Sequence, residues 1–235
     1  MSNRDQCNAI IAHLQTRANP HNVAGMARFG INPDHTLGIS IAVLRPIVKE
    51  TGKNQELSEM LWQSQIHEAR ILAAYIGMPG RVTEEQMERW ALDFDSWDIC
   101  DQCCSNLFSL TVFAYPKALE WSHRKEEFVK RAGYVLMTQL AVKDKKASNR
   151  QFEQFFEAII AGSSDRRNFV KKAVNWALRQ IGKRNIVLNQ KAIVLAREIQ
   201  KLDSPAARWI AADALRELTG PAVQAKLKGL SLRAN

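Results

Sequence analysis

The sequence predicts an all-α protein, and three observations lead to this fold class. Apolar residues recur at intervals of three and four along most of the 235 residues, which is the spacing that lines one face of a helix. Several of these runs follow Ser or Thr residues of the kind that begin helices. No run alternates apolar and polar residues well enough to be a strand, and no Asn-Gly or Asp-Gly hairpin signal occurs.

Local signals place the helices in order. Thr83 with Gln86 and Ser148 with Gln151 match the capping-box pattern, and Ser204 precedes a proline at a first helical position. Pro46 lies inside the third expected helix, which must therefore kink or start later. The expected helices cover residues 3–18, 20–30, 40–50, 54–63, 65–78, 83–93, 97–114, 117–124, 126–142, 149–161, 166–183, 186–201, 204–219 and 221–228.

The arrangement of these helices favours a solenoid of helix hairpins over a compact bundle. Short loops make consecutive helices antiparallel neighbours, and no long linker or change of composition divides the chain. HEAT-type repeats are helix pairs of roughly 40 residues. We therefore expect one HEAT-like α-solenoid domain over residues 1–235, with a concave binding face built from one helix of each pair.

The charge of the chain indicates a polyanionic partner. The formal net charge is +9 at pH 7 and the isoelectric point is about 9.6. A surplus of this size is more often associated with nucleic acid than with anionic lipid. We therefore expect the concave face to be basic.

Other features exclude several classes of protein. The apolar runs are too short to span a membrane, and "MSNRDQCNAI" does not resemble a secretory signal. Four cysteines, three of them crowded at 100–104, do not form a disulfide framework, so we expect a cytoplasmic, nucleoid-associated protein. A nucleotide-driven enzyme is disfavoured because the chain has neither a Walker motif nor a dinucleotide glycine pattern.

The stretch "FVKKAVNWALRQIGKRN", residues 169–185, has two faces when it is read as a helix. One is the expected core stripe of Phe169, Ala173, Ala177 and Ile181, with Val170 and Val174 beside it. The offsets of the second face place its four side chains together: Lys172, Trp176, Arg179 and Lys183. An indole in a row of cations is unusual for a purely structural helix, because a large apolar side chain normally joins the core.

The stretch "DSWDICDQCC" places Trp97 and Asp101 four residues apart on one helix face, which Cys104 and Phe108 continue. Asp95 or Ser96 is the expected cap, and the helix dipole favours Asp98 in the first turn. Capping does not explain Asp101, which lies deeper in the helix beside an indole.

In the stretch "EEFVKRAGYVLMTQLAVKDKK" the expected buried stripe consists of Phe128, Ala132, Val135 and Leu136, and Gln139 ends it. Arg131 lies off this stripe, on a face shared with Tyr134 and Thr138. Taken alone, Arg131 is expected to be a solvated helix arginine.

In this order, "WDxxD", the Arg of "KRAG" and the Trp176 helix resemble the AlkD-like family of DNA alkylation repair proteins. The segments "ANPHNVAGMARFGI", "LGISIAVLRPIVKE" and "LWQSQIHEARILAAYIG" are similar to that family's opening helices, so the resemblance covers nearly the whole chain. It implies a HEAT-like solenoid. It also implies a DNA glycosylase that excises cationic N-alkylated purines, such as 7-methylguanine and 3-methyladenine, from duplex DNA in base excision repair.

The resemblance also implies roles for individual residues. Trp97 and Trp176 match the two tryptophans that face the deoxyribose and backbone of the lesion, and Asp101 matches the catalytic aspartate. Arg131 matches an arginine that contacts a phosphate near the lesion. Lys172, Arg179 and Lys183 would then bind phosphates on either side of Trp176.

The implied chemistry is physically reasonable. An alkylated purine is cationic, so it leaves without protonation and the sugar becomes oxocarbenium-like. A nearby carboxylate stabilises that charge and can position or deprotonate the attacking water. The family leaves the damaged base in contact with the helix instead of extruding it, so the resemblance implies no deep base pocket.

Two weaker candidates remain open. Cys100, Cys103 and Cys104 could form a zinc site, but the usual ligand spacing is absent, so we expect buried free cysteines, no metal and no cofactor. Glu68 is either a supporting carboxylate near the concave face or an intrahelical partner.

Two functions therefore follow from the sequence. The first is a monomeric DNA glycosylase acting on double-stranded DNA that contains alkylated bases. The alternative is a non-catalytic HEAT-like module that binds DNA or an acidic protein through the same basic concave face. Asp101 favours the enzyme, because a carboxylate repels the backbone and adds nothing to a surface that only binds phosphates.

Overall fold

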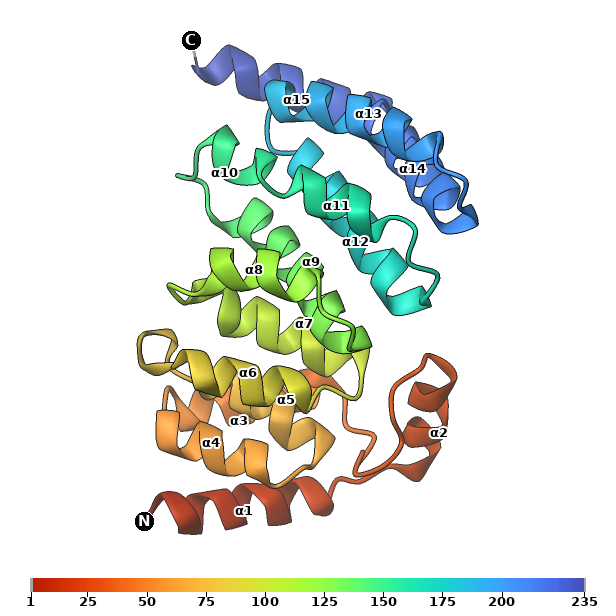
Figure 1. Cartoon of the computed structure of the whole chain (residues 1–235). Helices are drawn as coiled ribbons and strands as arrows, with labels where there is room; N and C mark the ends of the chain where they lie inside the picture. The colour runs from red at the N-terminus through yellow and green to blue at the C-terminus, as the bar shows by residue number, and fades with distance from the viewer. Residues whose placement is uncertain (1, 235) are drawn as a thin grey trace. The chain divides into compact units, whose positions relative to one another are not determined.

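The computed structural model describes the backbone of residues 2–234 and the side chains of residues 2–229. Within this part of the chain all regular structure is helical, which confirms the all-α fold class, and no helix is both long and apolar enough to cross a membrane. The α-helices, labelled in Figure 1, are α1 Asn3–Gln15, α2 Pro20–Arg28, α3 Ile41–Thr51, α4 Gln55–Gln63, α5 His67–Ile76, α6 Glu84–Leu92, α7 Trp97–Asn106, α8 Ala114–Ser122, α9 Glu127–Lys143, α10 Asn149–Glu153, α11 Phe156–Gly162, α12 Asn168–Gly182, α13 Ile186–Gln200, α14 Pro205–Leu218 and α15 Pro221–Ala234. Two 3₁₀ helices are η1 Pro79–Arg81 and η2 Phe108–Leu110.

The helix starts follow the local signals of the sequence, with one exception. Ser148 and Gln151 form a complete capping box, and Ser204 Oγ accepts a hydrogen bond from the Ala207 N–H. Thr83 caps α6 by accepting from the Gln86 N–H, but Gln86 returns no bond to Thr83. The expected capping box is wrong here because the Gln86 carboxamide is buried and its oxygen accepts from Gln55 Nε2 at 2.8 Å.

Several expected helices differ in extent from those observed, whereas the helix expected at 40–50 is observed nearly as predicted. The helix expected at 97–114 ends at Asn106, and η2 follows it. The helix expected at 149–161 divides into α10 and α11 at a tight turn, where the Phe155 N–H bonds to the Phe152 carbonyl three residues earlier. Helix α3 starts at Ile41 and continues through Pro46, so a later start is excluded.

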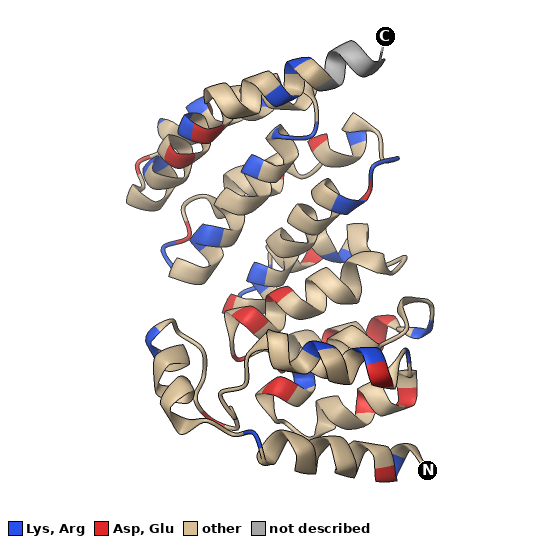
Figure 2. Cartoon of the chain, turned by 180° about the vertical axis from the view of Figure 1, so that it is seen from behind, with Lys and Arg blue, Asp and Glu red and all other residues tan. Residues whose placement is uncertain are grey.

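The chain folds into two compact units, Met1–Phe113 and Ala114–Asn235, and we describe each by itself. A single domain over residues 1–235 stays a prediction. Figure 2 shows Lys and Arg residues in both units. The basic surplus nevertheless lies in the second unit, because residues 114–235 hold 24 Lys and Arg against 11 Asp and Glu, whereas residues 1–113 hold 9 against 13.

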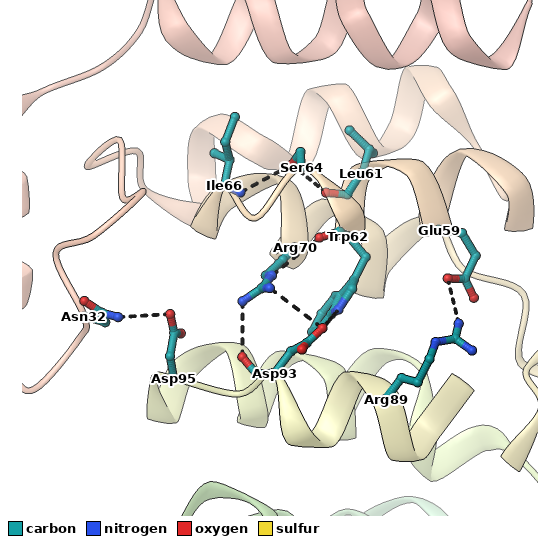
Figure 3. A network of polar contacts seen from close by, with 10 residues as sticks. All are labelled: Asn32, Glu59, Leu61, Trp62, Ser64, Ile66, Arg70, Arg89, Asp93 and Asp95. Atoms are coloured by element: carbon teal, nitrogen blue, oxygen red, sulfur yellow. Dashed lines mark hydrogen bonds and ion pairs between the residues drawn. The ribbon is translucent and has the colours of Figure 1, made fainter. Parts of the chain in front are cut away.

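In the first unit, α5 packs against α3, α4 and α7, and α1 packs against α4. Trp62 of α4 and Trp90 of α6 stack with their ring centroids 4.0 Å apart. Figure 3 shows the polar contacts around Trp62: its Nε1 donates to the Asp93 carboxylate at 2.8 Å, and Arg70 Nη1 donates to the Asp93 carbonyl at 3.2 Å. Asp93 therefore ties the end of α6 to both α4 and α5.

The second unit is built as two layers of helices. Helices α9, α12 and α14 pack side by side, and α8, α11 and α13 form the other layer against them. Gly133 allows α8 and α9 to approach closely, because a Cβ atom there would lie 2.5 Å from the backbone nitrogen of Ser122. Layers of paired helices are the arrangement expected for a HEAT-like fold.

The position of α9 corrects one sequence expectation. Its side chains are buried almost all around from Val129 to Ala141, including Tyr134 and Thr138, which are fully buried. The face expected to be solvated is buried because α9 is covered by α8 on one side and by α12 on another. A prediction from one apolar stripe assumes that only one face of the helix is packed, whereas α9 is packed on more than one face.

Candidate nucleic-acid interface

Helix α7 begins at Trp97 because the residues before it are fixed to the loop that follows α2. Ser96 occupies the N-cap position, but its Oγ accepts from the Asn32 N–H at 2.9 Å and makes no capping bond. Asp95 accepts from Asn32 Nδ2 at 3.1 Å (Figure 3). Asp98 lies in the first turn, as expected, and accepts from the Ile99 N–H at 3.0 Å.

The face of α7 that holds Trp97 and Asp101 emerges from the core at this end of the helix. Both side chains are half-buried, whereas Cys104 and Phe108 further along are fully buried. The Trp97 indole N–H donates to the Phe29 carbonyl at 3.0 Å, so the ring is held against the end of α2. Asp101 follows one helical turn later on the same side, as the spacing predicts.

A cavity of about 450 Å³ lies beside Trp97, between α2, the loop at 31–41, α5 and α7. Its lining is mostly apolar and includes Met26, Phe29 and Ile71. At its polar end His67 Nε2 lies 2.9 Å from the Asp98 carboxylate. Asp101 does not line this cavity, so the expected absence of a deep pocket at the lesion stays a prediction.

Buried His67 and half-buried Asp98 form a pair that no local pattern in the sequence indicates. Burial lowers the pKa of the His67 imidazole, but the hydrogen bond that it donates to Asp98 and the charges of Asp98, Glu68 and Asp95 outweigh this effect. The resulting pKa of His67 lies above its ordinary value of 6.5. The helix dipole alone is enough to explain an aspartate at the first-turn position of Asp98. No local pattern in the sequence indicates that this aspartate contacts a histidine 31 residues earlier.

Glu68 has neither of the roles considered from the sequence. Its side chain is fully buried and accepts from the N–H groups of Leu37 at 2.9 Å and Ile39 at 3.0 Å. A buried carboxylate is stabilised by such donors. Glu68 therefore holds the loop that lines the cavity beside Trp97.

In the second unit, α12 has the two faces that the sequence predicts. Ala173, Ala177 and Ile181 are fully buried with Val170 and Val174, while Phe169 is only half-buried. On the other side Lys172 is exposed and the other three residues are half-buried: Trp176, Arg179 and Lys183. We call these four residues the α12 row. The Trp176 indole nitrogen lies 3.3 Å from the Gln180 carboxamide.

Two cations of the α12 row already have acidic partners on α14. Arg179 and Lys183 both form ion pairs with Glu217, and Arg179 also lies 3.6 Å from the Asp213 carboxylate. Burial raises the pKa of Glu217, but the hydrogen bonds and charges of Lys183 and Arg179 lower it overall. Lys172 forms no ion pair with a described side chain, so it is the row's most accessible charge.

Arg131 is buried, with 6% of its surface exposed, contrary to the solvated position expected from the pattern alone. Its Nη1 donates to the Phe169 carbonyl at 2.6 Å and so joins α9 to the first turn of α12. A phosphate contact of Arg131 stays a prediction, and burial does not favour it.

Comparison with known proteins assigns the chain to a family. A family model described as "DNA alkylation repair enzyme" matches residues 10–218, which is most of the chain. The chain belongs to this DNA alkylation repair family. The match covers both units and includes every residue assigned above to a site.

A solved structure supports the fold of the family member described here. It is described as "a new family of proteins related to the HEAT-like repeat DNA glycosylases with affinity for branched DNA structures". It is 20% identical, with a TM-score of 0.74, and the match covers 90% of this chain and 95% of that chain. This likeness confirms the HEAT-like fold. The comparison with curated protein sequences finds no match.

The cysteines of this family member are buried thiols. Cys7, Cys100, Cys103 and Cys104 are free and buried, and burial raises the pKa of Cys103 well above its ordinary value. Among the described residues, no group of three or more His, Cys, Asp or Glu side chains is arranged to hold a metal ion.

Proposed function

We propose that this protein is a DNA glycosylase that removes cationic N-alkylated purines of the 7-methylguanine and 3-methyladenine type from duplex DNA. It would act as a monomer in the cytoplasm, at the nucleoid. Membership of the DNA alkylation repair family supports this proposal. The α7 geometry is the observation that carries it furthest.

On α7, a half-buried carboxylate lies one turn from a half-buried indole whose orientation is fixed by Phe29. Asp101 would face a sugar that lies against Trp97. The carboxylate would stabilise the oxocarbenium-like sugar as the base departs and would position the attacking water. Because an N-alkylated purine already carries positive charge, no acid is needed for its departure.

In the second unit the α12 row supplies the complementary contacts. Trp176 would offer a flat apolar surface to the sugar and backbone, and Lys172 would bind a phosphate next to it. Arg179 and Lys183 would exchange their carboxylate partners on α14 for phosphate oxygens. That exchange costs part of the energy of the phosphate contact, so Lys172 should contribute most per residue.

The direct test is incubation of the protein with duplex DNA that contains a single 7-methylguanine, scored by chromatography for the released base. The proposal expects release without added metal, and a chelator should leave it unchanged. A matched duplex with unmodified guanine is the control. If DNA is bound at the same concentration and no base is released over many hours, the glycosylase proposal is wrong.

The second candidate is a non-catalytic module that binds DNA or an acidic protein through the same basic residues. The affinity of the structural relative for branched DNA is the observation that favours it. Under this alternative the protein binds a four-way junction more tightly than a linear duplex and releases no base from either. A preference for the 7-methylguanine duplex, with release, excludes this alternative.

A further inference from the structure

A second basic site lies in the unit Ala114–Asn235, at the end of α12. A cavity of about 490 Å³ opens between the end of α9, the loop after it, the end of α12 and α15. Its polar lining consists of Lys145, Gln180, Lys183, Arg184, Asn185 and Lys226. We call this cavity the basic pocket. Figure 2 shows basic residues in blue in the loop after α9 and in the loop after α12.

The lining of the basic pocket includes four cations and no carboxylate. Asp144 lies nearby in sequence, but its carboxylate accepts from the N–H groups of Lys146 and Ala147 and from the Tyr115 hydroxyl. Lys145 and Lys226 are exposed and form no ion pair with a described side chain. The positive charge of the basic pocket is therefore only partly neutralised, by Glu217 at Lys183 and by the charge of Asp144, which acts on Arg184.

Arg184 is the fixed cation of the basic pocket. Its Nη1 donates to the Ala141 carbonyl at 2.6 Å, and its guanidinium carbon lies 3.9 Å from the centre of the Phe152 ring. These partners are neutral, so they hold the guanidinium in place without cancelling its charge. Its Nε is buried and has no hydrogen-bond partner. A guanidinium held in place beside exposed lysines is well suited to phosphate oxygens.

A helix terminus adds to the same field. Asn185 caps α13, a helix of 15 residues, so the positive end of its dipole begins at the wall of the basic pocket. Four cations and a helix start around one open cavity form a site for a dianionic or monoanionic phosphate group. The basic pocket offers little apolar surface and no aromatic ring to a larger ligand, since the apolar residues of its lining are Ala141, Val142 and Ala147.

We propose that the basic pocket binds a backbone phosphate of DNA beyond the α12 row. DNA as the source of the phosphate rests on the proposed function, whereas the phosphate site itself does not. Arg184 follows Trp176 by eight residues, which is roughly 12 Å along a helix axis. Since each strand of a duplex advances about 3.4 Å per nucleotide, a strand running along α12 would reach the basic pocket about three to four nucleotides from the Trp176 contact.

The first test replaces the two exposed lysines, in Lys145→Ala/Lys226→Ala, in the full chain. Duplex affinity is measured by fluorescence anisotropy over a series of salt concentrations. Loss of one phosphate contact flattens the slope of log affinity against log salt by about one unit. Lys49→Ala/Lys201→Ala removes the same charge from exposed positions outside the basic pocket and serves as the control. An unchanged slope, or an equal change in the control, overturns the proposal.

The second test locates the phosphate. Single methylphosphonate groups, which are neutral, replace each phosphate of the duplex in turn. One position should weaken binding by the wild type severalfold and binding by the Lys145→Ala/Lys226→Ala variant clearly less, because the variant retains only Lys183 and Arg184 of the four cations. Equal effects on both proteins at every position overturn the DNA assignment. If inorganic phosphate then binds the wild type and not the variant in calorimetry, the ligand is a free phosphate instead.

The two proposals fail in distinguishable ways. If the wild type releases no base, the glycosylase proposal is wrong, but the slopes of log affinity against log salt still test the basic pocket. If the basic pocket binds no DNA phosphate, single-turnover release of 7-methylguanine at saturating DNA is still observed. Only the difference in salt slope between the wild type and the Lys145→Ala/Lys226→Ala variant is then absent. At saturating DNA the variant is expected to release base at the wild-type rate, because saturation compensates for weaker binding and the two changed lysines belong to a different unit from Asp101.

Discussion

Arg179 of α12 forms an ion pair with Glu217 of α14, across 38 residues of sequence. The same carboxylate also binds Lys183. In the free protein this pairing neutralises part of the α12 row, which by sequence alone is uniformly basic. Phosphate binding by Arg179 and Lys183 therefore competes with Glu217, whereas binding by Lys172 does not.

The first prediction follows from this competition. Glu217→Gln releases Lys183 and removes one of the two acidic partners of Arg179, so duplex affinity should rise and its salt dependence should steepen by about one unit. Lys172→Ala should flatten the dependence of duplex affinity on salt by about one unit. Both are measured by anisotropy titrations over a salt series. Glu198→Gln, an exposed carboxylate on α13, makes the same charge change outside the row. An equal gain in Glu198→Gln would mean that only net charge matters.

The second prediction concerns Asp101. Asp101→Asn keeps the shape of the side chain and removes its negative charge, so the oxocarbenium-like transition state loses its nearest counterion. Single-turnover excision of 7-methylguanine should fall by at least about tenfold, or roughly 1.4 kcal/mol of barrier. Ground-state affinity should be unchanged or slightly higher. Excision at the wild-type rate would show that Asp101 has a structural role.

The third prediction distinguishes half-buried Trp176 from an exposed tryptophan outside the α12 row. Trp176→Ala removes a contact that exists before and during the reaction, so affinity and excision should fall together. A loss of about 1 kcal/mol, or roughly fivefold in affinity, is expected for a lost aromatic platform. Trp209→Ala on α14, where the ring is 42% exposed, is the control. Equal losses in both variants would assign the effect to general destabilisation.

The fourth prediction concerns the His67–Asp98 pair beside the cavity. Because the folded pKa of His67 is raised, its contribution to stability is complete below the ordinary value of 6.5 and is lost as the pH rises through the folded pKa. Asp98→Asn should therefore lower the free energy of unfolding more at about pH 5.5 than at about pH 9. Urea titrations at both values measure this. A difference that does not change with pH would show that the pair is not ionised.

The fifth prediction tests the close contact of α8 and α9. In Gly133→Ala the added Cβ would lie 2.5 Å from Ser122 N and 2.9 Å from Trp121 C, and both are backbone atoms. The helices must separate, so the free energy of unfolding should fall by about 1–3 kcal/mol. Gly25→Ala in α2 meets no atom within 4 Å and should be neutral or slightly stabilising. Equal stability of the two variants would contradict the observed helix contact.

The sequence by itself determined the features that depend on neighbouring residues. Most helix bounds agree within a few residues, and Ser148 and Ser204 cap as expected, because capping and periodicity act within one or two turns. The two faces of α12 were predictable for the same reason. The relation of Trp97 to Asp101 on α7 likewise follows from a spacing of four residues.

Only the tertiary structure decided how these faces are used. Arg131 is buried because α12 covers α9, and Glu68 is bound by loop N–H groups about 30 residues away. Glu217 lies 34 residues beyond Lys183 and still neutralises it. Helical periodicity specifies the direction of a side chain from its own axis, but not which neighbouring element will meet it. Burial and ion pairing depend on which neighbouring element a side chain meets, and only tertiary packing determines this.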